Sequence, residues 1–253
     1  MNPDPARHAS RLRIVLVGTQ HPGNIGSAAR ALKTMGLARL VLVAPEKSPN
    51  AESSALAAGA DDVLDAAAVY PDLAAAVADC RLVLGCTARS RRVQLEELLP
   101  REAASRAVAE AAAGAEVALV FGRERTGLDN HELQLCHAAV HIPANPDYSS
   151  LNLAAAVQVL AYELRLALLD DAGPTGQAEP RDPPAAHDEM EGLFAHLSQT
   201  LEQIDFHKGR APESAMRKLR RMFLRARLDQ REVRLLHGIL ADAERMAMLA
   251  GRR

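Results

Sequence analysis

The stretch IPANPDYSSLNLAAAV, residues 142–157, lies between a short apolar run and a long one. The short run, residues 139–142, has the length of a buried strand and ends at Pro143, which cannot donate to a neighbouring strand. The long run predicts a helix from Leu151 to about Leu169. A buried strand that leads through a polar loop into an apolar helix indicates a sheet covered by helices.

The head of this helix carries three polar side chains. Ser149 and Ser150 stand where an N-cap belongs, since their hydroxyls can accept hydrogen bonds from the unpaired N–H groups of the first turn. Asn152 would lie inside that turn, where a buried amide needs a hydrogen-bond partner. An ordinary capped helix and a functional loop both fit this stretch taken by itself.

Apolar runs and helical patterns alternate upstream. The apolar runs are continuous, so both faces of each strand should be buried, as in a parallel sheet covered by helices. We therefore predict an α/β fold, in which ligands bind beyond the carboxyl ends of the strands. The predicted strands are 14–17, 40–43, 62–64, 82–84, 117–121 and 139–142, and the predicted helices between them are 25–35, 54–58, 71–79, 101–113 and 130–136.

The composition indicates a globular protein with a core of small and aliphatic residues. Of the 253 residues 48% are hydrophobic, only 3% are aromatic and none is tryptophan. Base stacking on aromatic platforms, as in single-strand-binding proteins, therefore has little support. The polar first ten residues do not resemble a signal peptide, and no apolar run has the length of a membrane span. We expect a soluble, cytoplasmic protein.

Composition also divides the chain into four parts. These are a disordered arm (1–10), a main domain (11–169), a linker rich in Pro, Gly and Asp (170–187) and a helical C-terminal domain (188–253). The formal net charge is −2, but the C-terminal domain holds 13 Lys and Arg against 10 Asp and Glu, whereas the residues before it hold 17 against 22. Basic charge is thus concentrated in the C-terminal domain.

The C-terminal domain should contain three helices. Apolar residues from Met190 to Ile204 recur at helical spacing. A second helix should begin at Pro212 and a third at about Asp229, with Glu232 as its capping-box partner. A helical unit of this size is too small to be very stable alone, so we expect it to dock on the main domain or a second subunit.

The three cysteines do not indicate a disulfide framework or a zinc site, since no pair has metal-ligand spacing. Cys136 together with His137 and His141 could ligate a metal, but a free cysteine is more often a small buried hydrophobic residue. We expect no metal.

The loop after the first strand is rich in glycine, which invites comparison with dinucleotide-binding proteins. The pattern G-x-G-x-x-G is absent, no acidic residue ends the second strand, and no Walker motif is present. What remains is Asn24 and Arg30 at the start of a helix. A structural ion pair would also explain Arg30.

Two later loops gather charge at predicted strand ends. Gly122 allows a ligand or another chain to approach the backbone closely, and Glu124 lies between two arginines, as in a salt-bridged surface turn. Arg89, Arg91 and Arg92 suit phosphate groups through bidentate contacts, although a solvated basic loop is an equal alternative.

Three motifs in order carry a resemblance to a known family. Residues 24–30 read N-x-G-x-x-x-R, residues 121–128 read FGRE-x-x-GL, and residues 142–152 read IP-x-NP-x-x-SSLN. Over residues 11–169 the chain resembles the SpoU branch of the SPOUT RNA methyltransferases, and it is most similar to the TrmJ-type tRNA ribose 2′-O-methyltransferases. The resemblance implies a C-terminal trefoil knot, S-adenosylmethionine bound in the knot, and a homodimer that completes each active site.

The family's cofactor contacts fall on small residues and backbone groups of this chain. By this resemblance they are Thr87, Ala88, Arg89, Gly122, Ile142, Ser149, Ser150 and Leu151.

The implied reaction transfers the sulfonium methyl group to a ribose 2′-hydroxyl. The corresponding arginine of relatives is the proposed base. A guanidinium is a donor that normally keeps its proton, so an equal alternative is that Arg30 holds a phosphate and stabilises developing negative charge. Ser150 and Asn152 would position the hydroxyl and Arg30. Asn24 and Glu124 would orient the guanidinium.

The implied RNA partner is tRNA, at the ribose of anticodon-loop position 32 with cytidine or uridine accepted. Alternatives are a ribosomal RNA methyltransferase of the same family, a non-catalytic knotted RNA-binding protein and, at the level of the fold alone, a nicotinamide oxidoreductase. The basic residues that we expect to contact RNA phosphates are Arg89, Arg91 and Arg92 near the site, and Lys208, Arg210, Arg217, Lys218, Arg220, Arg221, Arg225 and Arg227 in the C-terminal domain.

Overall fold

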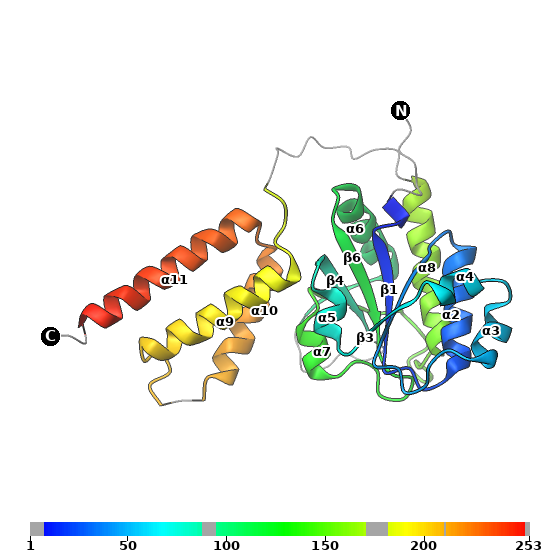
Figure 1. Ribbon diagram of the computed structural model, residues 1–253, viewed down its shortest axis with the longest axis horizontal. Helices are drawn as coiled ribbons and strands as arrows, with labels where there is room; N and C mark the ends of the chain where they lie inside the picture. Colours follow the sequence, from blue (N-terminus) through cyan, green and yellow to red (C-terminus); the bar gives the residue numbers. More distant parts are fainter. Residues whose placement is uncertain (1–7, 88–94, 171–181, 210, 251–253) are drawn as a thin grey trace. The chain divides into compact units, whose positions relative to one another are not determined.

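A computed structural model describes residues 8–87, 95–170, 182–209 and 211–250. The chain forms two compact units, Met1–Gln177 and Ala178–Arg253, and the boundary between them falls within the predicted linker (Figure 1). Ala88, Arg89, Arg91, Arg92 and Arg210 lie outside the described residues.

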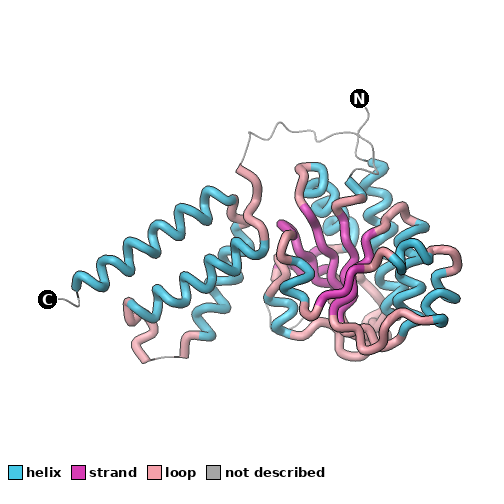
Figure 2. Tube along the Cα trace, in the orientation of Figure 1, coloured by secondary structure: helices cyan, strands magenta, loops and turns pink. Residues whose placement is uncertain are grey.

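The first unit is built on one sheet whose paired strands all run parallel, which confirms the predicted α/β fold (Figure 2). The strand order is β3-β2-β1-β6-β4-β7-β5, so β7 is inserted between β4 and β5. The strands are β1 (Leu12–Val17), β2 (Arg39–Val43), β3 (Ala68–Tyr70), β4 (Cys80–Cys86), β5 (Glu96–Leu98), β6 (Glu116–Phe121) and β7 (Ala138–Val140).

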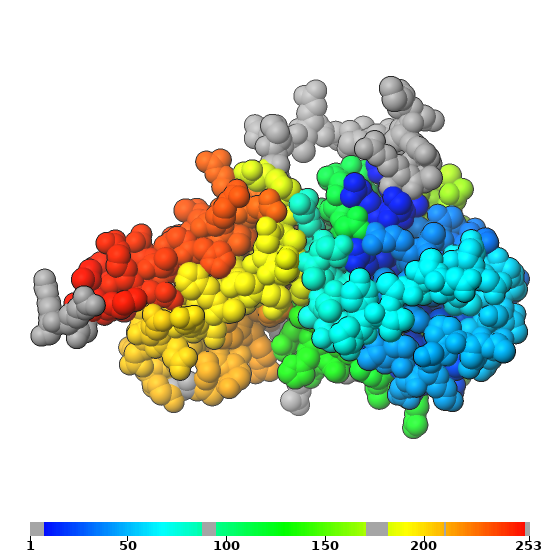
Figure 3. Space-filling view, in the orientation of Figure 1, coloured from blue at the N-terminus to red at the C-terminus, as the bar shows by residue number. Residues whose placement is uncertain are grey.

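Helices bury both faces of this sheet. Alternate residues of β1 belong to different core clusters: Ile14 and Leu16 pack with α2, α6 and α8, whereas Val15 and Val17 pack with α5 and α7. Figure 3 shows α3 and α4 on the surface of the same unit. The helices are α2 (Pro22–Thr34), α3 (Ala51–Ala57), α4 (Asp61–Asp65), α5 (Leu73–Val77), α6 (Pro100–Ala112), α7 (Asn130–Gln134) and α8 (Leu153–Asp170).

Three predictions about the secondary structure were wrong. Residues 62–64, predicted as a strand, lie in α4, where Val63 and Leu64 are buried on one side of a short helix. The strands β3 and β5 were not predicted, because both are three residues long and largely exposed, and so lack a continuous apolar run.

The helix that follows the central stretch is capped by Asn152 rather than by Ser149 or Ser150. The Asn152 Oδ1 accepts hydrogen bonds from the backbone N–H groups of Ala154 (2.9 Å) and Ala155 (3.3 Å). Asn152 therefore stands before the first turn of α8, and not inside it. Asparagine is as favourable as serine at this position, since its amide oxygen reaches the same N–H groups.

The arm before β1 is shorter than predicted. Ala9 is only 6% exposed and belongs to the larger core cluster. The carbonyl of Ser10 accepts a hydrogen bond from the Arg39 guanidinium (3.0 Å). Residues 8–10 are thus part of the folded unit.

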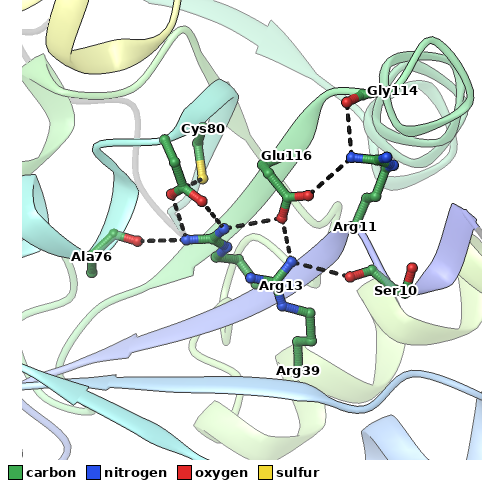
Figure 4. A network of polar contacts seen from close by, with 9 residues as sticks. Ser10, Arg11, Arg13, Arg39, Ala76, Cys80, Gly114 and Glu116 are labelled. Carbon is green, nitrogen blue, oxygen red and sulfur yellow. Dashed lines mark hydrogen bonds and ion pairs between the residues drawn. The ribbon is translucent and has the colours of Figure 1, made fainter.

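A network of ion pairs joins the amino-terminal ends of β1, β2 and β6 (Figure 4). The Arg13 side chain, 3% exposed, donates to both Asp79 carboxylate oxygens (2.8 and 2.6 Å) and to Glu116 (3.0 Å). Glu116 also accepts from Arg11 (3.2 Å) and from Arg39. Burial opposes ionisation of Glu116, but hydrogen bonds from Arg39 and Arg13 outweigh it and hold the pKa of this carboxyl below its ordinary value.

Replacing Glu116 with glutamine should lower the free energy of unfolding by about 1–3 kcal/mol at pH 7, because the buried Arg13 loses a charged acceptor. The lowered pKa means that this stabilisation is complete above pH about 4.5 and is lost as the pH falls through the folded-state value. Urea unfolding of the unchanged protein and of Glu116→Gln, measured from neutral to acidic pH, should show that the difference between their free energies of unfolding becomes smaller in acid. Asp62→Asn, which removes the exposed pair with Lys33, is the matched control and should change the free energy of unfolding far less.

The second unit contains the three predicted helices, α9 (His187–Gln203), α10 (Glu213–Ala226) and α11 (Gln230–Ala250). Its own small core includes Met190, Phe194 and Leu224. The predicted capping box of α11 is formed, since Asp229 and Glu232 exchange side-chain to backbone hydrogen bonds of 2.8 Å each. No helix in the described part of either unit is long and apolar enough to cross a membrane.

Candidate active site

A cavity of about 420 Å³ opens at the carboxyl ends of β4, β6 and β7, within the range of about 300–1,000 Å³ that is usual for small-molecule sites. Its walls come from the loops after these three strands and from the start of α8. The lining residues are Cys86, Thr87, Phe121, Gly122, Arg123, Glu124, Arg125, Thr126, Gly127, Val140, Ile142, Ser149, Ser150, Leu151, Leu153 and Ala156.

The structure brings the predicted cofactor-binding residues together in this cavity. Every one of them that the structure describes lies in the wall: Thr87, Gly122, Ile142, Ser149, Ser150 and Leu151. Sequence reasoning missed the apolar wall residues Phe121, Val140 and Leu153, which stand at strand ends and at the start of α8. The sequence feature that could have identified them is their position within or next to the motifs and the predicted strand ends.

Gly122 is required by the protein's own backbone. A Cβ atom at this position would lie 2.1 Å from Gly127 C and 2.1 Å from Leu128 N. Gly127, with φ +67°, turns the chain back so that its N–H donates to the Arg123 carbonyl (2.8 Å). Gly122 therefore allows the backbone of the following loop to pack closely against it, and this loop forms one wall of the cavity.

Glu124 fastens this loop to the loop after β1. Its carboxylate accepts hydrogen bonds from the backbone N–H groups of Gln20 (3.0 Å) and His21 (3.1 Å) and from Asn24 Nδ2 (2.9 Å). Burial raises the pKa of Glu124, but these hydrogen bonds, led by that of Asn24, outweigh it, so the pKa lies below its ordinary value. The carboxylate is thus a fixed anion and not a proton carrier near neutral pH.

A chain of side-chain hydrogen bonds joins all three sequence motifs. Asn24 Nδ2 donates to Glu124, and Asn24 Oδ1 accepts from Asn152 Nδ2 (3.0 Å). The Asn152 side-chain oxygen, Oδ1, caps α8. In each asparagine the amide oxygen accepts hydrogen bonds and the amide nitrogen donates one, to partners on different segments. These bonds hold the start of α2, the loop after β6 and the start of α8 together.

Arg30 does not take part in this chain. Six residues separate it from Asn24 on α2, which places the two side chains about 120° apart around the helix. The Arg30 side chain is exposed and has no hydrogen bond or ion pair among the described residues. The structural ion pair that would have explained this arginine is not formed there.

The two arginines beside Glu124 differ in their contacts. Arg123 donates to Glu132 (3.0 Å) and packs over Gly18. Arg125 is exposed, lines the cavity and has no partner among the described residues. Because neither arginine pairs with Glu124, the interpretation as a salt-bridged turn was wrong, and Arg125 is a cation at the cavity that sequence reasoning missed.

The basic residues of the second unit also divide into two kinds. Arg220 donates to Glu191 (2.9 Å) and lies 4.6 Å above the ring of Phe194, so it packs within the unit. The other described members of the predicted RNA-binding set on α10 are exposed: Arg217, Lys218, Arg221 and Arg225.

Cys136 and His137 have structural partners. The Cys136 thiol lies 3.4 Å from the Glu132 carbonyl, and the Val83 N–H donates to His137 Nδ1 (3.0 Å). These contacts place both side chains in the packing of β4 against the segment before β7.

Comparison with known families identifies this arrangement. The model of the SpoU rRNA Methylase family matches residues 11–162, which include the whole cavity and the three motifs. The chain belongs to the SpoU methylase family. A second model, the C-terminal domain of the tRNA methyltransferase TrmJ, matches residues 188–252 of this SpoU methylase.

Individual relatives are similar in sequence to this SpoU methylase over nearly its full length. It is 47% identical to the tRNA (cytidine/uridine/adenosine-2'-O-)-methyltransferase TrmJ of Pseudomonas aeruginosa strain UCBPP-PA14, covering 94% of this chain and 95% of that one. It is 51% identical to the tRNA (cytidine/uridine-2'-O-)-methyltransferase TrmJ of Escherichia coli K12, covering 92% and 95%. The crystal structure of TrmJ from Z. mobilis ZM4 matches with a TM-score of 0.79 and 35% identity over 92% of this chain and 98% of that one.

Proposed function

We propose that this SpoU methylase transfers a methyl group from S-adenosylmethionine to a ribose 2′-hydroxyl of tRNA, at anticodon-loop position 32, with cytidine or uridine accepted. The observation that carries the proposal is the hydrogen-bonded union of Asn24, Glu124 and Asn152 at the rim of a ligand-sized cavity. The names of the TrmJ relatives support the substrate class. The cytoplasm, where tRNA is abundant, is the proposed location.

The cavity suits the proposed cofactor. Ile142, Leu151 and Phe121 offer apolar surface to an adenine ring, and Thr87 and Ser150 offer hydroxyl groups to polar atoms. When bound, S-adenosylmethionine supplies an electrophilic methyl group on a sulfonium. A trefoil knot is part of the proposal, and the insertion of β7 between β4 and β5 supports it.

Replacing Gly122 with alanine should weaken binding of S-adenosylhomocysteine at least about 10-fold and cost about 1–3 kcal/mol of stability, because the new methyl group meets the backbone of the loop that forms the cavity wall. Isothermal titration calorimetry and urea unfolding measure the two effects. Gly192→Ala is the control, since a Cβ atom there meets nothing within 4 Å. Unchanged affinity of the Gly122 variant for S-adenosylhomocysteine would place the cofactor elsewhere.

The 2′-hydroxyl must lose its proton, to a phosphate oxygen or to water, as its oxygen bonds to the methyl carbon and the bond from that carbon to sulfur breaks. Arg30 is the group that we propose for stabilising the negative charge that develops on this oxygen. A guanidinium is a donor, so it stabilises the developing oxyanion and a neighbouring phosphate better than it removes a proton. Because Arg30 points away from Asn24 on α2, we place it in the site of a second subunit of a homodimer. Glu124 and Asn24 then hold the loops, and Ser150 positions the hydroxyl.

Exposed cations supply the proposed contacts to RNA. Arg125 lies at the cavity, where it suits a phosphate next to the target ribose. Arg217, Lys218 and Arg225 form an exposed arc on α10, since residues at these spacings fall on one side of a helix. The second unit favours tRNA over ribosomal RNA, because it matches the TrmJ C-terminal domain.

The test is methyl transfer from labelled S-adenosylmethionine to bulk tRNA and, separately, to ribosomal RNA, followed by alkaline hydrolysis. A 2′-O-methyl group blocks cleavage of the adjacent phosphodiester, so label in an alkali-resistant dinucleotide from tRNA is the expected result. Label in ribosomal RNA alone would favour the other SpoU substrate class. Label in a single nucleotide would mean base methylation, and no label in either RNA would favour a non-catalytic role.

A further inference from the structure

Tyr148 is the most exposed large apolar side chain in the described part of the chain, with 81% of its surface accessible. It lies in the loop between β7 and α8. An aromatic ring contributes binding free energy when a ligand buries its area, so the exposed Tyr148 ring is available for such a contact.

The backbone that carries this ring is held in place. The Tyr148 N–H donates to the Asn145 carbonyl (2.9 Å), and the Asp147 N–H donates to Asn145 Oδ1 (3.1 Å). An asparagine that accepts from the residue two positions later forms an Asx turn, which fixes the direction of the chain. Tyr148 is thus exposed on an ordered turn.

Tyr148 directly precedes three residues of the cavity wall. Ser149, Ser150 and Leu151, the next three residues, all line the cavity wall. Consecutive Cα atoms are about 3.8 Å apart, so the Tyr148 side chain begins one residue outside that wall.

We propose that Tyr148 is the stacking platform for the base of the target nucleotide, and so a positioning residue for methyl transfer; this inference rests on the proposed function. RNA-binding proteins read single-stranded bases by splaying them onto aromatic rings. Stacking tolerates any base, since every base has a π-face, and this agrees with acceptance of more than one pyrimidine. The scarcity of aromatic residues argues against a track for several bases, but one base needs only one ring.

Kinetics with two variants test the ring. Tyr148→Ala should lower kcat/KM for tRNA roughly 10- to 100-fold, because loss of one stacked base costs on that order. Tyr148→Phe, which keeps the ring and loses the hydroxyl, should stay within about threefold of the unchanged protein. The melting temperature and the affinity for S-adenosylhomocysteine should not change in either variant, since the ring is outside the folded core.

The absence of tryptophan permits a direct measurement of stacking. Tyr148→Trp gives a single indole at the proposed platform, and tRNA should quench its fluorescence saturably in the presence of S-adenosylhomocysteine. Val69→Trp is the matched control, because Val69 is 62% exposed on β3, several strands away from β7. Its fluorescence should change little.

Two results would overturn the proposal: full kcat/KM in Tyr148→Ala, or equal quenching of the two indoles. A change in the sedimentation coefficient of Tyr148→Ala would assign the ring to contact with a second copy instead. Methylation of tRNA by the unchanged protein tests the proposed function separately, so an inactive parent protein and an unimportant Tyr148 give different outcomes.

Discussion

Arg30→Ala should reduce methyl transfer to tRNA by roughly 100- to 1,000-fold or more, while S-adenosylhomocysteine binds within about twofold of its normal affinity. The large effect is expected because a guanidinium aimed at developing negative charge stabilises the transition state and not the bound cofactor. Single-turnover methylation at saturating tRNA measures the chemical step, and calorimetry measures cofactor affinity. Normal turnover in this variant would remove Arg30 from the mechanism.

Lys33→Ala is the matched control on the same helix. Lys33 is also an exposed cation of α2, but it pairs with Asp62 (2.8 Å). This variant should retain nearly full activity. Arg30→Lys separates two roles: the ammonium keeps the charge but loses the planar fork, so partial activity would indicate charge stabilisation, and activity equal to that of alanine would indicate bidentate binding.

Mixed dimers test whether Arg30 acts across subunits. When Arg30→Ala and Gly122→Ala chains, each of which should be impaired alone at low S-adenosylmethionine, are co-expressed with different tags, the mixed dimer contains one site with an intact cavity and an intact Arg30 only if the two come from different chains. We expect such dimers to regain activity in one of their two sites. Inactive mixed dimers would place Arg30 and the cavity of one chain in the same site.

Replacing Arg217, Lys218 and Arg225 with glutamine should weaken tRNA binding about 100-fold at ~0.15 M salt. Each lost phosphate contact reduces the slope of log K against log salt by about 0.9, so three lost contacts should flatten the slope by almost three. Filter binding from 50 to 300 mM salt, roughly the range over which such slopes are resolved, measures both quantities.

The control for this variant removes the same charge from α11. Arg231, Arg234 and Arg245 are likewise exposed and lie in the same unit, and their replacement by glutamine should change tRNA affinity far less. Equal losses in the two triple variants would show that the unit attracts tRNA only by its net charge. No loss in either would assign the second unit to packing or to contact between subunits.

The sequence was sufficient for the fold class and for the expectation that the motif residues meet at one edge of the sheet. Continuous apolar runs marked the central strands, and the motif residues of the cavity followed directly after them, so their convergence at one sheet edge could be predicted from topology. The edge strands β3 and β5 escaped prediction because their pairing is decided by the strands beside them and not by local apolar character.

The sequence did not predict which hydrogen-bond partner each side chain has. Asn152, Ser149 and Ser150 are all good N-caps, and only the docking of α8 against α2 decides that the asparagine oxygen faces α8 while its nitrogen reaches Asn24. In the same way, a basic stretch on α10 does not reveal that Arg220 contacts Glu191 and Phe194. Such choices depend on contacts between residues far apart in the chain.

The hydrogen-bond chain from Glu124 through Asn24 to Asn152 spans 128 residues of sequence between its two asparagines. Domains fold as units during synthesis, beginning with the part that leaves the ribosome first. A growing polypeptide therefore has no working centre until Asn152 has been added, which is past the middle of the 253-residue chain. Premature termination before α8 would release a fragment that has most of the sheet but cannot methylate tRNA.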